Sequence, residues 1–315
     1  MLNLIFLLVG FIPLIYGANF LVDGSSSLAK RFNIPNIVIG LTVVAFGTSA
    51  PELVVNIFSS VQKTTDITMG NIIGSNIFNI AVILGVTSVM KNLNVKTNTT
   101  WKEIPMALLA ASLVIIMIND VTIDRNKLSE LSRIDGMVLI SFFIIFLSYT
   151  LSMIKSGSFD EEITIKEYTL SKSVLLTALG LIMLVVGGKI IVMFAVKFAK
   201  SMGISERVIG LTIVSIGTSL PELATSVSAA LKNNVDIAIG NVVGSNIFNI
   251  LFVLGISSII YPIPLLGGVN FDIAINIFLN LLLFLFVFSG KGRKIERWEG
   301  ISFIAIYVFY LIYLM

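Results

Sequence analysis

The sequence contains no cysteine and no histidine, and it is poor in charged residues. Without these two residues there is no disulfide, no thiolate or imidazole metal ligand, and no Cys nucleophile or His base, so we do not expect an enzyme. Only 12% of the 315 residues are charged, whereas roughly a quarter are charged in a soluble domain. The 21 Lys and Arg barely exceed the 18 Asp and Glu, which argues against nucleic-acid binding.

Long apolar runs make up most of the chain instead. Hydrophobic residues account for 56% of it and the mean hydropathy is +1.00, which predicts an all-α integral membrane protein in a lipid bilayer. One crossing needs about 20 such residues, and ten runs approach or exceed that length. The first run lacks the features of a cleaved signal peptide, so we expect it to be a span. The expected spans are 2–22, 35–61, 67–90, 104–118, 136–154, 173–198, 207–231, 236–262, 268–289 and 299–315.

A polar interval at 155–172 divides the chain into halves of five spans each, 1–154 and 173–315. Loops on the side of this interval hold thirteen Lys and Arg residues, and loops on the other side hold seven. The positive-inside rule therefore places 155–172 in the cytoplasm as a linker and both termini outside. We expect a multi-pass protein of the cell's inner (plasma) membrane, and no obligatory protein partner is evident from the sequence.

The two halves carry the same pattern at an offset of 170 residues. VIGLTVVAFGTSAPELV at 38–54 aligns with VIGLTIVSIGTSLPELA at 208–224, and 25 of 48 positions are identical between 38–85 and 208–255. Five spans are an odd number, so the second copy enters the membrane from the opposite face. The sequence thus predicts ten transmembrane helices in two inverted five-helix repeats. Secondary transporters share this architecture, with the site near the membrane midplane.

Each repeat places one carboxylate deep inside a span, Glu52 in GTSAPE and Glu222 in GTSLPE. A charged group at this depth costs about 3 kcal/mol on insertion scales and normally faces a cavity or an ion path. A structural carboxyl paired with another helix is the alternative, but packing would not require the same Glu in both copies. We therefore predict that both carboxylates bind substrate.

Hydroxyl groups accompany each carboxylate. Thr48 shares a helix face with Glu52, and Ser49 lies beside it. The second repeat has the same arrangement, with Thr218 and Ser219. These residues are candidate oxygen ligands.

A proline follows the hydroxyls in each copy. Pro51 and Pro221 have no N–H, so a kink is expected that frees the carbonyls of Gly47 and Gly217. Irregular backbone at this depth is tolerated where it is buried in protein or lines a cavity. The kinks point to the same two segments as the carboxylates.

The next span of each repeat reads GNIIGSNIFNI at 70–80 and GNVVGSNIFNI at 240–250. Its glycines are four residues apart and are interpreted as helix packing positions. Ser75 and Asn79 share one face, as do Ser245 and Asn249, and we predict these four as ligands. The remaining amides are expected to form hydrogen bonds between helices.

The candidate ligands are carboxylates, hydroxyls, amides and carbonyls, so all coordinating atoms are oxygen. Such a set suits hard cations, Ca²⁺ and by the same logic Na⁺, rather than zinc or copper. Protons would compete for the two carboxylates. The ions are transported substrates, and no cofactor is expected.

The paired GTSAPE/GNIIGSNIFN and GTSLPE/GNVVGSNIFN motifs resemble the cation/Ca²⁺ exchanger superfamily, specifically prokaryotic Na⁺/Ca²⁺ antiporters, over essentially the whole chain. The resemblance implies Na⁺/Ca²⁺ exchange by alternating access, mainly Ca²⁺ extrusion. The ion-binding core then comprises spans 2, 3, 7 and 8, with spans 1 and 6 sliding across it. The implied ligands are Glu52, Glu222, Thr48, Ser49, Thr218, Ser219, Ser75, Ser245, Asn79 and Asn249, with the carbonyls of Ala45 and Ser215.

One position departs from some archaeal relatives, which have Asp where this chain has Asn249. The departure leaves the number of Na⁺ ions and the proton sensitivity open. A Ca²⁺/H⁺ or other cation exchanger on the same fold is the first alternative. An intramembrane enzyme or a channel is the second, which the missing His and Cys and the inverted repeats disfavour.

Overall fold

The computed structural model describes residues 2–63, 65–123, 125, 128–155, 166–201, 215–265, 268–289 and 292–314. Within these ranges, eight helices are long and apolar enough to cross a membrane, and the bent pair Asn36–Thr48 and Ala50–Val61 makes a ninth span. The predicted span 207–231 lies partly outside the described residues, as does most of the predicted linker 155–172. The all-α character expected from the sequence is confirmed.

Two span boundaries differ most from the expectation. The first helix continues past residue 22 to Arg31. The fourth span begins at Thr99 and not at Ile104, because Thr99–Glu103 forms a wide helical turn continuous with it. The length of the apolar runs did not predict either extension, because each extension adds polar or charged residues to the end of the helix.

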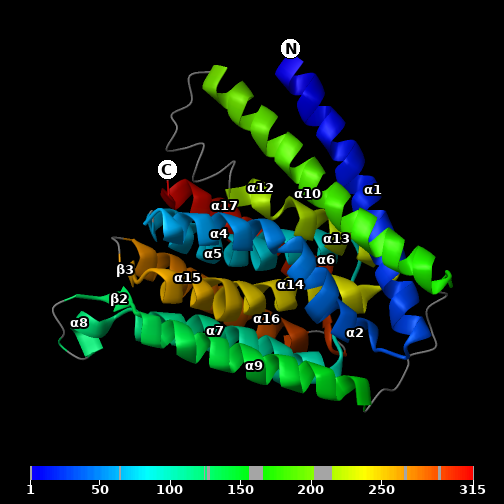
Figure 1. Cartoon of the computed structure of the whole chain (residues 1–315). Helices are drawn as coiled ribbons and strands as arrows, with labels where there is room; N and C mark the ends of the chain where they lie inside the picture. The colour runs from blue at the N-terminus through cyan, green and yellow to red at the C-terminus, as the bar shows by residue number, and fades with distance from the viewer. Residues whose placement is uncertain are drawn as a thin grey trace. The chain divides into compact units, whose positions relative to one another are not determined.

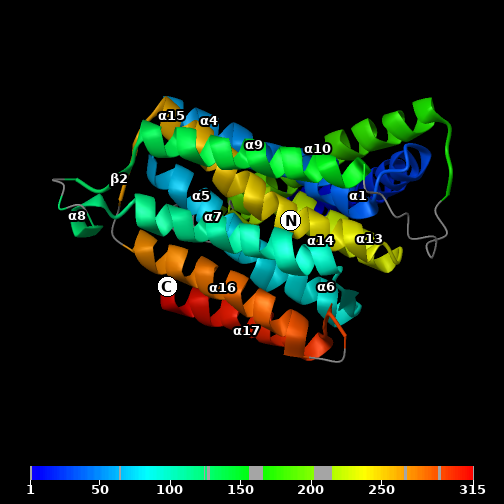
Figure 2. The same cartoon turned by 90° about the horizontal axis from the view of Figure 1, so that it is seen from below.

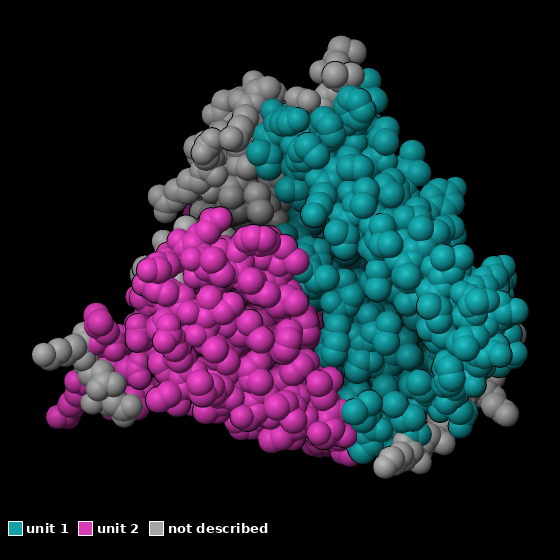
Figure 3. All heavy atoms as spheres, in the orientation of Figure 1, with its two compact units in different colours: residues 1–51, 150–242 teal, residues 52–149, 243–315 magenta. Residues whose placement is uncertain are grey.

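The chain divides into two compact units, and each contains segments of both sequence halves (Figure 3). Unit 1 comprises residues 1–51 and 150–242, and unit 2 comprises residues 52–149 and 243–315. The division into units therefore differs from the division into repeats. The units are described separately below.

Unit 1 contains two long helices and several short ones. Its elements are α1 (Leu2–Arg31), α2 (Asn36–Ile39), the π-helical turn η1 (Gly40–Val44), α3 (Ala45–Thr48), α10 (Leu170–Ser201), α12 (Ser215–Thr218), α13 (Leu220–Leu231) and the first part of α14 (Val235–Ile247).

Helices α1 and α10 pack side by side and antiparallel (Figures 1 and 2). Glycines allow the close approach. A Cβ atom at Gly17 would lie 2.9 Å from the carbonyl oxygen of Gly180, and one at Gly187 would lie 2.7 Å from the amide nitrogen of Leu14 and 3.0 Å from the Gly10 carbonyl oxygen. Gly10 and Gly17 are the repeat equivalents of Gly180 and Gly187, so the contact maps onto itself when the repeats are exchanged. This symmetry is that of an inverted repeat.

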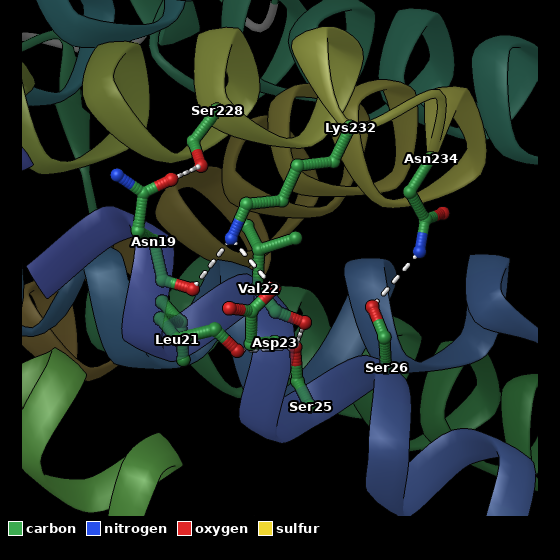
Figure 4. Close-up of polar contacts among 9 residues, drawn as sticks. All are labelled: Asn19, Leu21, Val22, Asp23, Ser25, Ser26, Ser228, Lys232 and Asn234. Atoms are coloured by element: carbon green, nitrogen blue, oxygen red, sulfur yellow. Dashed lines mark hydrogen bonds and ion pairs between the residues drawn. The ribbon is translucent and has the colours of Figure 1, made fainter. Parts of the chain in front are cut away.

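A polar contact joins α1 to α13 in the same unit (Figure 4). The Lys232 ammonium, just after α13, lies 2.6 Å from an Asp23 carboxylate oxygen and 2.9 Å from the Asn19 carbonyl oxygen. The Ser228 hydroxyl donates to the Asn19 side chain at 2.9 Å. A further hydrogen bond joins Asn234 to Ser26.

Within the described residues, unit 2 contains the remaining helices and four two-residue strands. Its elements are most of α4 (Ala50–Val61), α5 (Thr65–Phe78), η2 (Asn79–Leu84), α6 (Gly85–Met90), β1 (Leu93–Asn94), η3 (Thr99–Glu103), α7 (Ile104–Met117), α8 (Asp120–Ile123), β2 (Glu130–Leu131), most of α9 (Arg133–Lys155), the end of α14, η5 (Phe248–Leu254), α15 (Gly255–Ile260), β3 (Ile263–Pro264), α16 (Val269–Ser289), β4 (Lys294–Ile295) and α17 (Arg297–Leu314).

The core of unit 2 is formed by α5–η2–α6 and by the repeat-related end of α14 with η5 and α15. Side chains such as Ile77, Leu84 and Ile250 are at most 1% exposed there. Helices α7, α9, α16 and α17 instead expose large apolar side chains, for example Ile144 at 58% and Phe309 at 71%. Apolar exposure on this scale fits contact with lipid, in which backbone polar groups are satisfied inside each helix.

The strands of unit 2 pair across the repeats. β1 pairs with β4 and β2 pairs with β3, both antiparallel. β1 and β3 each follow the third span of their repeat, and β2 and β4 each precede the fifth, so the two pairs are equivalent. The fifth spans also begin alike: Asp135 accepts the backbone N–H of Ser132, and Glu299 accepts that of Glu296, as in capping boxes.

Candidate functional site

The helix is interrupted at both GTS motifs, and the predicted kink is confirmed at the first. Helix α3 ends at Thr48, Ser49 has φ −82° and ψ 9°, and the two parts of the span are bent by 48°. Ser219 has φ −90° and ψ 5°, and it separates α12 from α13. Pro51 and Pro221 follow each break, where they cannot donate the hydrogen bond that would continue the helix.

In unit 1 the hydroxyl groups of the first motif face the carboxylate of the second. The Ser49 hydroxyl donates to Glu222 Oε1 at 2.8 Å. The Thr48 hydroxyl donates to Asn241 Oδ1 at 3.0 Å. The amide of Asn241 in turn donates to the Glu222 carbonyl at 3.2 Å and to Ser226 at 2.9 Å. Asn241 therefore fixes the two predicted ligands Thr48 and Glu222 relative to each other.

Glu222 is fully buried in this cluster. Its second carboxylate oxygen, Oε2, has no hydrogen-bond partner among the described residues. A buried acceptor without a hydrogen-bond donor destabilises the folded protein unless it binds a proton or a cation. The cluster therefore has the chemistry of a cation ligand.

In unit 2 the carboxylate of the first motif is also fully buried, with Glu52 at 0% exposure. The Ser75 hydroxyl donates to Glu52 Oε1 at 3.4 Å. The Asn56 amide donates to the Glu52 carbonyl at 2.7 Å, one helical turn away. The structure thus brings together Glu52 and Ser75, two of the predicted ligands.

The amides of the GSNIFN segments meet in unit 2. Asn79 Nδ2 donates to Asn246 Oδ1 at 2.9 Å, and Asn249 Nδ2 donates to Asn76 Oδ1 at 3.1 Å. All four residues are at most 2% exposed. The Oδ1 atoms of Asn79 and Asn249 have no hydrogen-bond partner among the described residues. They are a pair of neutral acceptor oxygens that could bind a cation.

Both GSNIFN segments lead into a π-helical turn. η2 starts at Asn79, and η5 starts at Phe248, next to Asn249. Wide turns of this kind occur frequently at functional sites. The two predicted amide ligands therefore lie where the backbone leaves regular α-helical geometry.

The other predicted ligands lie in the same sequence motifs or next to them. Ser219 and Ser245 are fully buried, and Thr218 ends α12. The Ala45 carbonyl accepts the Ser49 N–H at 3.0 Å and the Thr48 hydroxyl at 3.3 Å. Ser215 is the first residue of α12.

Asn241, Asn76 and Asn246 are the residues that the sequence analysis did not place at the site. They were expected only to pack helices, and their hydrogen bonds do join helices, but each of these bonds orients a predicted ligand. Their recurrence in both repeats was the available signal. Among the described residues no three Asp or Glu side chains come together as a metal cluster, so each cluster relies on one carboxylate and neutral oxygens.

Comparison with known proteins agrees with this picture. A model of the sodium/calcium exchanger protein family matches residues 2–152 and 172–315. The putative antiporter CaxA of Alkalimonas amylolytica is 36% identical, with 97% of this chain and 96% of that protein covered. The inner membrane protein YrbG of Escherichia coli is 34% identical over 81% of this chain and 79% of its own.

A solved structure is also similar over the whole length. The sodium-calcium exchanger NCX_Mj, soaked with Na⁺ and Ca²⁺, superposes with a TM-score of 0.85 at 37% identity, covering 100% of this chain and 99% of that one. The fold is therefore that of this exchanger, which confirms the expected ten transmembrane helices in two inverted repeats.

Proposed function

Because the chain belongs to the sodium/calcium exchanger protein family, we propose that it exchanges Na⁺ for Ca²⁺ across the cytoplasmic membrane, mainly to expel Ca²⁺. It is a multi-pass membrane transporter of the cation/Ca²⁺ exchanger type and not an enzyme. The observation that most supports the proposal is the pair of buried, repeat-related oxygen clusters, each with one carboxylate, Glu52 or Glu222.

We propose that the two clusters supply the oxygen ligands of the transported cations. Carboxylate, hydroxyl, amide and carbonyl oxygens are the groups that Ca²⁺ prefers, at six to eight per ion. The acceptors of Glu222, Asn79 and Asn249 that lack donors among the described residues favour a positively charged occupant. The full proposed set is Glu52, Glu222, Thr48, Ser49, Thr218, Ser219, Ser75, Ser245, Asn79, Asn249 and the carbonyls of Ala45 and Ser215.

The charge of this set bears on the stoichiometry. With Asn at both 79 and 249, the two ionised Glu residues contribute a formal charge of −2, which one Ca²⁺ neutralises. Exchange of three Na⁺ for one Ca²⁺ would carry one net charge inward, worth about 2.3 kcal/mol at 100 mV toward Ca²⁺ expulsion. We propose this electrogenic exchange. Protons are the competing ion, because either Glu can take one up.

The distribution of Lys and Arg among the loops predicts how the chain is oriented in the membrane. We propose that the segment 155–172 is cytoplasmic and joins the repeats 1–154 and 173–315, with both termini outside. The similarity to an inner membrane protein of E. coli supports a location in the inner (plasma) membrane.

Uptake of ⁴⁵Ca²⁺ into proteoliposomes loaded with Na⁺ tests the function. We expect uptake that requires the outward Na⁺ gradient. Uptake should increase with an inside-positive potential, because three positive charges leave the vesicle with Na⁺ for every two that enter with Ca²⁺. Uptake that follows a pH gradient and ignores Na⁺ would establish Ca²⁺/H⁺ exchange instead. Na⁺-dependent uptake without voltage dependence would retain the ions and reject the stoichiometry.

A further inference from the structure

Four buried amides in unit 2 form a crossed arrangement between the two GSNIFN segments. Asn76 Nδ2 donates to the backbone carbonyl of Asn246 at 3.1 Å, and Asn246 Nδ2 donates to the backbone carbonyl of Asn76 at 3.4 Å. Each of these two residues then uses its side-chain oxygen to accept an amide of the other repeat, from Asn249 and Asn79 respectively. The pattern maps onto itself when the repeats are exchanged.

The backbone carbonyls determine which way every amide points. A carbonyl oxygen only accepts, so the Asn76 and Asn246 side chains must present their nitrogens to it. Their Oδ1 atoms consequently lie on the opposite side, where only a donor is stable. Asn249 and Asn79 must supply that donor, which leaves their own Oδ1 atoms as buried acceptors without partners among the described residues.

We propose that Asn76 and Asn246 are positioning residues that direct the ligand oxygens of Asn249 and Asn79 toward the transported cation. This assignment rests on the proposed function, because it treats Asn79 and Asn249 as cation ligands. Neither positioning residue coordinates the ion. Groups that hold a metal ligand in place typically change metal affinity about 10–100-fold when they are removed.

The crossed pattern also accounts for an amide rather than a carboxylate at position 249. Asn249 donates a hydrogen bond to Asn76 Oδ1. An ionised Asp has no donor, so Asn249→Asp would place two acceptor oxygens against each other in a buried site. Rotating the Asn76 amide would only move the conflict to the Asn246 carbonyl.

Double-mutant cycles test the assignment through the equilibrium affinity for ⁴⁵Ca²⁺ of the purified full-length protein. We expect Asn76→Ala and Asn246→Ala each to weaken Ca²⁺ binding about tenfold. Asn76→Ala should add less than about threefold once Asn249→Ala is present, because its effect passes through Asn249. Asn246→Ala should likewise add little to Asn79→Ala.

The same-helix pairs provide the contrast. Asn76→Ala with Asn79→Ala, and Asn246→Ala with Asn249→Ala, should multiply to about a hundredfold loss. If the roles were purely structural, the effects on Ca²⁺ affinity would instead be non-additive for these neighbours one turn apart, or additive for every pair. Either pattern would overturn the proposal.

Asn280→Ala is the matched control, because Asn280 is a buried amide of the same unit whose hydrogen bonds, among the described residues, run only to Asn276 in its own helix. It should leave Ca²⁺ affinity within about threefold of wild type. An equal loss in this control would show that any buried amide matters and would overturn the assignment. Gel filtration monitors folding, and serine replaces alanine in any variant that aggregates.

Absence of Ca²⁺ binding by the wild type itself would refute the proposed function, whereas wild-type binding with a different coupling pattern would refute only the role of the two asparagines.

Discussion

At the scale of single residues, two buried carboxylates dominate the chemistry of the chain. Glu52 and Glu222 are both fully buried, and each accepts a hydroxyl hydrogen bond, from Ser75 and Ser49 respectively. Other buried carboxylates have different partners. Glu103 accepts the Tyr149 hydroxyl in unit 2, and Glu299 caps a helix. Burial alone therefore does not distinguish a ligand from a structural acid, whereas the surrounding oxygen set does.

Removing one charge at either candidate ligand should stop transport. We expect Glu52→Gln and Glu222→Gln each to reduce Na⁺-dependent ⁴⁵Ca²⁺ uptake more than about a hundredfold, since the amide lacks the charge that balances Ca²⁺ in a water-poor site. Gel filtration should still give a monodisperse protein. Glu103→Gln is the control with equal burial and should retain uptake within a few-fold of wild type. Normal exchange by either ligand variant would contradict the site assignment.

At the scale of elements, α1 combines a symmetric contact with an asymmetric one. Its glycine contact with α10 is repeated by the twofold relation of the repeats. Its polar contact with α13 has no counterpart in the other repeat, because at the 170-residue offset Asp23 corresponds to Met193 and Lys232 corresponds to Gln62. The Lys232–Asp23 ion pair therefore occurs at only one of the two positions that the repeat relation makes equivalent.

The glycine contact should not tolerate a methyl group. Gly187→Ala places Cβ 2.7 Å from the Leu14 backbone, so α1 and α10 must separate, at a cost of about 1–3 kcal/mol for overpacking. We expect a lower Tm in detergent and slower exchange. Gly188→Ala is the control at the adjacent position, where the nearest atom would lie 3.7 Å away. Equal behaviour of the two variants would show that the helices are not held at this separation.

Breaking the ion pair should have a smaller effect. Both side chains are about one-third exposed, at 30% and 32%, so Lys232→Gln should lower stability by at most about 1 kcal/mol. That corresponds to roughly 2 °C in Tm for a protein of this size. Asp23→Asn should act similarly, and the double variant should be no worse than either alone. An additive double variant would mean that the two residues do not interact.

The exposed pair Lys30–Glu167, with a 2.6 Å separation, is the control for this series. The Lys30 ammonium lowers the pKa of the Glu167 carboxyl. A lowered pKa favours the folded state at neutral pH, and this contribution disappears as the pH falls through that pKa. Solvent screens this exposed pair and makes the contribution small, so Glu167→Gln should lower Tm at pH 7 by less than Lys232→Gln does.

At the scale of the whole molecule, the inverted repeat makes a definite topological prediction. Lys30 and Lys200 are equivalent residues at the ends of α1 and α10. Inverted copies place them on opposite sides of the membrane. Cysteines introduced at each position, in a chain that has no other cysteine, should react with an impermeant maleimide from opposite sides of sealed vesicles. Labelling from the same side would refute the inverted arrangement in the membrane.

The sequence by itself determined the membrane class, the repeats and the residue types of the site. Apolar run length reports bilayer crossings directly, because a span must satisfy its backbone within one helix. The 170-residue offset identified equivalent residues, and Pro51 and Pro221 predicted the kinks because proline cannot donate a backbone hydrogen bond. The inversion followed from the odd number of spans.

Only the tertiary structure decided which equivalent residues meet and how they are oriented. An offset pairs Asn76 with its copy Asn246, but it does not show that Asn76 bonds to Asn249 or that Ser49 bonds to Glu222. These partners are both 173 residues apart in sequence. The orientation of each amide depends on a backbone carbonyl of the other repeat, so it exists only once the helices have packed. The Lys232–Asp23 contact, which has no equivalent in the other repeat, likewise depends on which helix faces pack together. The periodicity of residues within a single helix does not determine this.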